Sequence, residues 1–136
     1  MATSTYLSNP TLTVNAVDLS DQTTSATLTV KYDALESTAF GSGSRVYTAG
    51  LGDHELVCEL FMSYAASETY ATLAALVGTA TTVVMKPTSA AVGATNPSFT
   101  LTGTYLESLP VIDATLGELS SISLTFRGGV FTTATS

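Results

Sequence analysis

Hydrophobic and polar residues alternate in several separate stretches of the chain, as they do in β-strands with one buried face. The clearest stretch covers residues 53–62, where apolar residues occupy one side of the period and acidic residues the other. The apolar set is Leu56, Cys58, Leu60 and Met62, and the acidic set is Asp53, Glu55 and Glu59. This stretch is predicted to be a strand with one apolar and one acidic face.

The spacing of apolar residues changes after residue 66 to every third or fourth position, which is typical of a helix. Ser67 stands where an N-cap is expected, with Ser63 as a competing cap, and Gly78 follows the last apolar position. The predicted helix covers residues 67–77. Its expected core residues are Tyr70, Leu73, Leu76 and Val77. A helix this short is marginal alone, so packing must hold it.

Strands are also predicted at residues 11–17, 26–32, 79–86, 98–107 and 119–127. The first two are expected to pair as a hairpin across the polar segment between them. Six or seven strands with one helix indicate a mainly β single domain, residues 1–136. The expected architecture is an antiparallel β-sandwich or barrel flanked by a short α-helix.

Residues 33–51 show no clear period and contain a Gly-Ser-Gly-Ser run, so they are predicted to form a long loop. Phe40, Arg45 and Tyr47 give this loop groups with which to contact a partner, and we expect it to become ordered there. The alternative is a flexible hairpin tip without a partner. Residues 1–10 are polar and are expected to form an N-terminal arm.

Composition narrows the function classes. The chain has 136 residues, of which 45% are hydrophobic and 11% charged, and a net charge of −7. A folded acidic domain without a cluster of Lys or Arg is not expected to bind nucleic acid. Cys58 is the only cysteine, which excludes an internal disulfide. No apolar run approaches the ~20 residues of a membrane span and no signal peptide is recognisable, so we expect a soluble product that does not bind membranes.

Candidate chemistry is sparse. His54 beside Asp53 resembles part of a catalytic triad, but no nucleophile-elbow motif accompanies it. His54 would also point away from Asp53, Glu55 and Glu59 in a strand, which disfavours a metal site. The glycine-rich segments lack the lysine and spacing of a phosphate loop. We therefore expect no enzymatic activity, no catalytic residue, no metal and no cofactor.

Several segments in the last two thirds of the chain resemble one protein family. They are residues 64–79 (YAASETYATLAALVGT), 86–92 (KPTSAAV), Thr95-Asn96-Pro97 with Phe99, residues 116–119 (LGEL) and Thr125-Phe126. Together they resemble the major tail (tail tube) proteins of long-tailed, non-contractile bacteriophages, particularly those of actinobacterial hosts. The resemblance implies a structural virion protein of the phage tail, assembled in the host bacterial cytoplasm.

The family implies hexameric rings that stack into a tube through a long loop and the termini. The tube is the conduit for DNA ejection, and the implied partners are further copies, a tape-measure protein and tail-end proteins. Under this hypothesis Asp53, Glu55 and Glu59 line the channel, while Phe40, Arg45 and Tyr47 contact the next ring. An acidic wall suits double-stranded DNA that must pass without specific binding. The alternatives are a capsid decoration protein, a tail terminator or an unrelated β-sandwich binding module.

Overall fold

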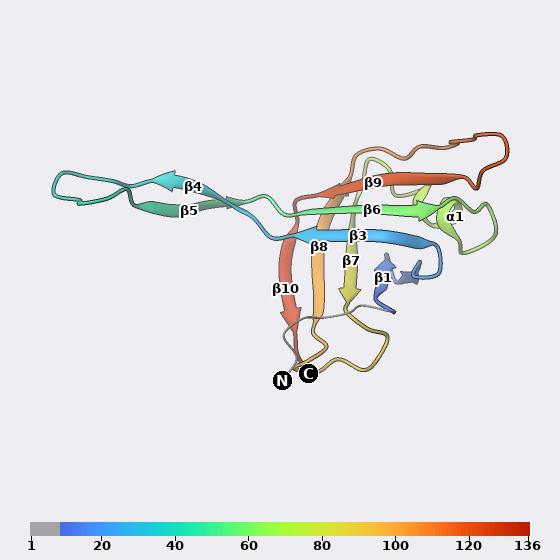
Figure 1. Cartoon of the computed structure of the whole chain (residues 1–136), viewed down its shortest axis with the longest axis horizontal. Helices are drawn as coiled ribbons and strands as arrows, with labels where there is room; N and C mark the ends of the chain where they lie inside the picture. Colours follow the sequence, from blue (N-terminus) through green and yellow to red (C-terminus); the bar gives the residue numbers. More distant parts are fainter. Residues whose placement is uncertain (1–8) are drawn as a thin grey trace.

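The computed structural model describes residues 9–136, which form a body of crossed strands and a long projecting hairpin (Figure 1). Residues 1–8, most of the predicted N-terminal arm, lie outside the described residues. The body contains an antiparallel sheet in the order β2-β1-β7-β8-β9-β6-β3, with β10 also paired to β8. The hairpin, β4 and β5, is a sheet of its own.

The strands of the body are short. They are β1 (Thr11–Val14), β2 (Val17–Asp18), β3 (Thr23–Thr29), β6 (Glu55–Phe61), β7 (Ala80–Lys86), β8 (Ser98–Leu106), β9 (Ser121–Arg127) and β10 (Val130–Ala134). The hairpin consists of β4 (Tyr32–Glu36) and β5 (Tyr47–Gly52), and the helix α1 covers Thr69–Leu73.

The sheet folds over on itself into two layers. In Figure 1, β3, β6 and β9 cross the direction of β1, β7, β8 and β10. Strand β8 joins the layers, because Ser98–Thr102 pair with β10 whereas Tyr105 and Leu106 pair with β9. The core lies between the layers and is closed at one end by the helix segment. Its largest fully buried members include Leu12, Leu19, Leu56, Leu60, Leu73, Leu101, Leu106, Leu124 and Phe126.

Two glycines between β9 and β10 turn the chain from one layer into the other. Gly128 and Gly129 have φ values of +72° and +93°, which L side chains rarely adopt. A Cβ on Gly129 would lie 2.9 Å from the carbonyl oxygen of Thr102, too close for any side chain. Gly103 (φ +74°) is the extra residue of a β-bulge in β8 and lies beside Gly129. Strand β8 and the connection from β9 to β10 therefore bend at the same place.

The predicted fold class is confirmed: residues 9–136 are mainly antiparallel β-structure with one short helix. The alternation that predicted the strand at residues 53–62 corresponds to β6, whose Leu56, Cys58 and Leu60 are buried and whose Val57 and Glu59 are exposed. Strand β9 shows the same pattern, with Ile122, Leu124 and Phe126 buried.

The predicted helix at residues 67–77 is too long. The α-helix covers only Thr69–Leu73, and its N-cap is Glu68 without a side-chain capping bond. Ser67 has φ +62° and does not cap the helix. Residues 74–78 form turns, and Leu76 in these turns is buried. Its position continues the three- and four-residue spacing of apolar residues, so the sequence predicts a longer helix than the structure contains. Sequence spacing therefore located the packed face but not the helix end.

Three strand predictions need correction. Residues 11–17 do not pair with 26–32: β1 pairs with β2 and β7, and β3 pairs with β6. The predicted loop at 33–51 is largely the β4–β5 hairpin. Strand β10 was not predicted, because only Phe131 of its five residues is even partly buried.

Candidate assembly surfaces

The β4–β5 hairpin, here called the arm, stands clear of the body (Figure 1). All five residues of β4 are exposed, and Gly50 is the only residue of β5 that is partly covered. The arm begins at Lys31, whose N–H donates to Nδ1 of His54 (3.2 Å) and whose carbonyl oxygen accepts from the N–H of Asp53 (2.8 Å). These bonds fix the root of the arm to the body.

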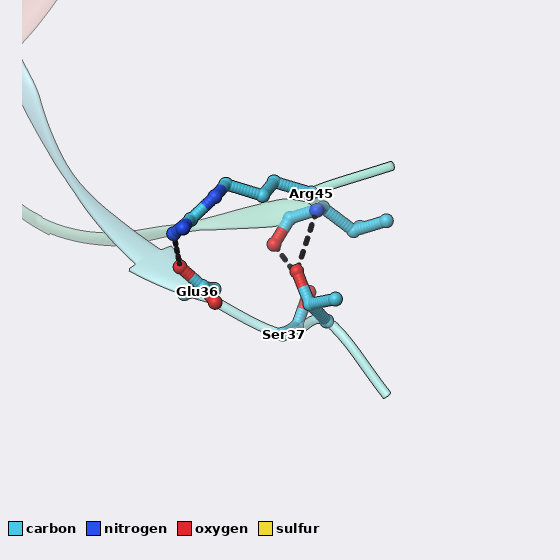
Figure 2. A network of polar contacts seen from close by, with 5 residues as sticks. Glu36, Ser37 and Arg45 are labelled. Atoms are coloured by element: carbon cyan, nitrogen blue, oxygen red, sulfur yellow. Dashed lines mark hydrogen bonds and ion pairs between the residues drawn. The ribbon is translucent and has the colours of Figure 1, made fainter. Parts of the chain in front are cut away.

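The two faces of the arm differ. Leu35 pairs with Thr48, and Glu36 pairs with Tyr47, so the two pairs lie on opposite faces. One face carries Leu35 with the hydroxyl groups of Ser37 and Thr48, which are 3.1 Å apart. The other carries Tyr47 and an ion pair between Arg45 Nη1 and Glu36 Oε2 (2.9 Å; Figure 2). An exposed pair of this kind stabilises by at most about 1 kcal/mol.

Beyond these pairs the arm narrows to a tight tip. The Val46 N–H donates to Thr38 Oγ1 (2.8 Å), and the Ser37 N–H donates to the Val46 carbonyl oxygen (2.8 Å). At the tip the Ser42 N–H donates to the carbonyl oxygen of Ala39, with Gly41 at φ +92°. Phe40 sits in this turn with its side chain fully exposed.

The arm carries an unusual amount of uncovered apolar surface for a two-stranded ribbon. Its exposed large hydrophobic residues are Tyr32, Leu35, Phe40, Val46, Tyr47 and Leu51. A lone two-stranded hairpin is marginally stable in water, and apolar surface of this kind marks an interaction site. The sequence pattern predicts contacts by Phe40, Arg45 and Tyr47 but does not point to Leu35, Val46 and Leu51. Leu35, Val46 and Leu51 flank the Gly-Ser run in the sequence, and this position is the only feature that could have indicated them as contacts.

The predicted acidic face lies on the outer side of the β3-β6-β9 layer. Glu59 is exposed between Ser25 of β3 and Ser123 of β9, with no ion-pair partner in residues 9–136. Glu55 differs, because its Oε2 lies 3.7 Å from Arg127 Nη1. Asp53 is exposed just before β6 begins. The surface around the two glutamates is mostly Ser and Thr.

Arg127 also approaches Glu107, with 3.7 Å between its Nε and Glu107 Oε2. Three glutamates, Glu55, Glu59 and Glu107, therefore accompany one arginine on this side of the body. These four side chains have a net charge of −2, three negative against one positive, and Asp53 lies beside them. The electrostatic potential of this face is weaker than three uncompensated acids would give.

The predicted helix-core residues divide into two groups. Leu73 and Leu76 are buried, with 0% and 9% of their surface exposed, and both belong to the main core. Val77 is exposed at 38%, which corrects the prediction that it is core, because the chain has already left the helix there. Tyr70 is half-buried and packs its ring against Tyr64.

His54 and Cys58 have structural surroundings. His54 is buried, faces Tyr32 edge-on and accepts the Lys31 N–H, so it connects the arm to the body. Cys58 is buried in the core, and burial raises the pKa of its thiol to about 12. Residues 9–136 contain no group of three metal-ligating side chains, and no helix among them is long and apolar enough to cross a membrane.

The sheet of the body ends in uncovered strands. Within residues 9–136, strands β2, β3 and β10 each have a hydrogen-bonded neighbour on one side only, so β3 presents unpaired backbone groups along its other side. Open edges of this kind can accept a strand from another chain. The arm, the acidic face and the edge of β3 are thus three separate surfaces on one small body.

No family model matches the chain, and no curated protein matches its sequence. Its structure is similar to a chain of the PVC extracellular contractile injection system in a sheath–tube complex in the extended state (TM-score 0.69, 11% identity, 98% of this chain and 93% of that chain). A second similar chain comes from the sheath/tube terminator of that system in the extended state (0.68, 14%, 97% and 97%). A third comes from the anti-feeding prophage cap, described as a tube terminating cap (0.68, 17%, 100% and 95%). These likenesses establish a shared fold over nearly the whole of each chain.

Proposed function

We propose that this chain is a structural subunit of a phage tail tube. In this proposal, copies form hexameric rings, the rings stack into a tube, and the tube conducts DNA into the host during ejection. The fold supports the proposal, because chains of the same fold occur in solved tube assemblies. The partners in the virion would be further copies, a tape-measure protein and tail-end proteins.

The arm is the observation that carries the proposal. A protein that functions alone has no use for a ribbon with six exposed large hydrophobic residues, and such a ribbon is a liability in solution. A subunit of a repeating assembly gains from it, because the same surface is buried in every copy. The uncovered edge of β3 supports the same conclusion, since neighbouring subunits can occupy it.

The outer face of the β3-β6-β9 layer suits the wall of a DNA channel. Double-stranded DNA carries one negative charge per about 1.7 Å, and lysines or arginines on the wall would bind it. The face has Ser and Thr around Glu55 and Glu59, and its one arginine is held by glutamates. We propose that this face lines the channel, with Asp53 at its margin.

A tail terminator is the second candidate. Two of the similar chains come from structures described as a sheath/tube terminator and a tube terminating cap. A terminator would form one closed ring and would not stack further.

Electron microscopy of the purified protein over a range of concentrations separates these candidates. A tube subunit forms tubes whose length increases with concentration, whereas a terminator forms single rings. A protein that remains monomeric at all concentrations would contradict both.

Glu59→Lys tests the channel wall. We expect the variant to assemble as the wild type does, because Glu59 has no ion-pair partner in the described chain to lose. Six new cations per ring would then hold DNA, so purified tubes should bind DNA with an affinity that falls steeply as salt rises. In a reconstituted phage, ejection should slow.

Glu59→Gln is the matched control, since it removes the acid without adding a cation and should leave both measurements near wild type. Unchanged DNA binding and ejection kinetics in Glu59→Lys would show that this face lies outside the channel.

A further inference from the structure

An apolar groove of about 340 Å³ opens between β3 and the layer formed by β1, β7, β8 and β10. Its walls include Leu28 of β3, Val30 just after β3, Met85 of β7, Phe99 of β8 and Phe131 of β10. Phe99 and Phe131 stack with their ring centroids 6.1 Å apart, which gives the groove a flat aromatic side. Its volume is at the lower end of the ~300–1,000 Å³ range of binding pockets. The groove is therefore large enough for an aromatic side chain.

One end of the groove is positively charged. Lys86 lines it, and its Nζ donates to the carbonyl oxygen of Ala90 (3.0 Å). No carboxylate of residues 9–136 lies within 4.0 Å of this ammonium group. The groove thus offers apolar walls and a cation without a carboxylate partner.

The tip of the arm carries an aromatic side chain that fits the apolar walls of the groove. Phe40 is fully exposed in a turn that is closed by the Ser42 N–H and supported by the Glu36–Arg45 ion pair (Figure 2). The hydrogen bond of the turn fixes the backbone at Phe40 before binding, so less conformational entropy is lost when the ring docks. Glu36 and Arg45 neutralise one another near the tip, and Asp33 lies at the root, so the contact made by Phe40 itself is apolar.

The arm cannot reach the groove of its own chain. Val30 lines the groove at the root of the arm, and ten residues separate it from Phe40. At about 3.3 Å per residue the tip lies roughly 30 Å from that root. Figure 1 shows the arm directed away from the body. A paired ribbon of this length cannot place its tip beside its own root, so a Phe40 ring in the groove must come from another copy.

We propose that Phe40 of one copy docks in the groove between β3 and the β7-β8-β10 layer of the next copy. This proposal rests on the proposed function, because it needs the chain to assemble with itself. It adds the receptor site on the neighbouring copy.

A cross-link between copies tests the docking. One batch carries Ala39→Cys beside the intact Phe40, and a second carries Thr24→Cys, an exposed residue on the groove wall. The matched control is Thr27→Cys, which is exposed on the same strand but does not line the groove. Cys58 stays unmodified, because its thiol is buried and its pKa is raised to about 12. A bismaleimide should join Ala39→Cys to Thr24→Cys several times more than to Thr27→Cys.

A second test uses two variants that each lack one half of the contact. The arm-deleted variant, with residues 36–47 replaced by Asn-Gly, keeps its groove, and Leu28→Arg keeps its arm but has a blocked groove. Each alone should remain unable to form the contact. The arm-deleted variant mixed with Leu28→Arg should form a 1:1 complex, since one groove and one arm are intact.

Phe40→Ala in the Leu28→Arg chain should weaken this 1:1 complex by roughly 30-fold or more, as expected for an aromatic anchor. Equal cross-linking at Thr24→Cys and Thr27→Cys would overturn the proposal, as would unchanged affinity with Phe40→Ala. If cross-linking at Thr24→Cys appears only after deletion of residues 2–8, the groove in the full chain has another occupant and the proposal is again wrong. Tubes formed by the wild type in the same experiments would show that the proposed function stands even then.

Discussion

Replacing residues 36–47 by Asn-Gly is expected to abolish tube formation and leave the body folded. Leu35 and Thr48 are Cα partners, so a two-residue turn between them closes a short hairpin in the existing register. The deletion removes Phe40, Val46 and Tyr47, half of the exposed apolar side chains of the arm. Far-UV circular dichroism should keep its β-sheet spectrum, while sedimentation should show monomers or single rings at concentrations where the wild type forms tubes.

A matched control keeps the length of the arm and changes only its ion pair. Arg45→Gln removes the Arg45–Glu36 pair, which is exposed and stabilises little, so it should still assemble. Tubes formed by the arm-deleted variant at the wild-type critical concentration would show that the arm is not needed for stacking.

Leu73→Ala is expected to destabilise the body by about 2–5 kcal/mol, because it leaves a cavity under the helix. Leu73 is fully buried and belongs to the main core. Small domains are stable by only about 5–15 kcal/mol, so much of the variant should be lost from the soluble fraction. Where soluble protein is obtained, its melting temperature should fall on the order of 10 °C or more.

The measurement is best made in the arm-deleted background, because assembly would add stability that depends on concentration. Val77→Ala is the control: Val77 is exposed and lies just beyond the helix, so its replacement should change stability by about 0.5 kcal/mol or less. Equal melting temperatures for Leu73→Ala and Val77→Ala would mean that the helix segment does not seal the core.

The strands with one buried face could be predicted from sequence, and the arm could not. In β6 and β9, burial of every second side chain selects apolar residues at that period. Both faces of the arm are exposed in the single chain, so apolar residues are not required at every second position of β4 and β5. The sequence of these strands therefore lacks the alternation that predicts a strand. Strand β10 was missed for the same reason, since it covers the core with Phe131 alone.

The candidate surfaces were predictable only in part. An aromatic residue and an arginine around a Gly-Ser run indicated a contact segment, and Phe40 and Arg45 do lie at its exposed end. The Arg127–Glu55 contact joins residues of β9 and β6, so it depends on a strand register that local spacing does not contain. The groove likewise combines side chains from β3, β7, β8 and β10, which only the crossed layers bring together.

Each copy has one arm, and it projects from one side of the body (Figure 1). A contact between an arm and the body of the next copy joins two different surfaces, so the series never closes along the axis. Any tube built in this way is directional. One end displays a row of free arms and the other a row of free receptors, and each end grows or stops by different chemistry. Two unlike end proteins are then required. One covers the free apolar arms at the first end, and the other provides groups that fill the free receptors at the second end.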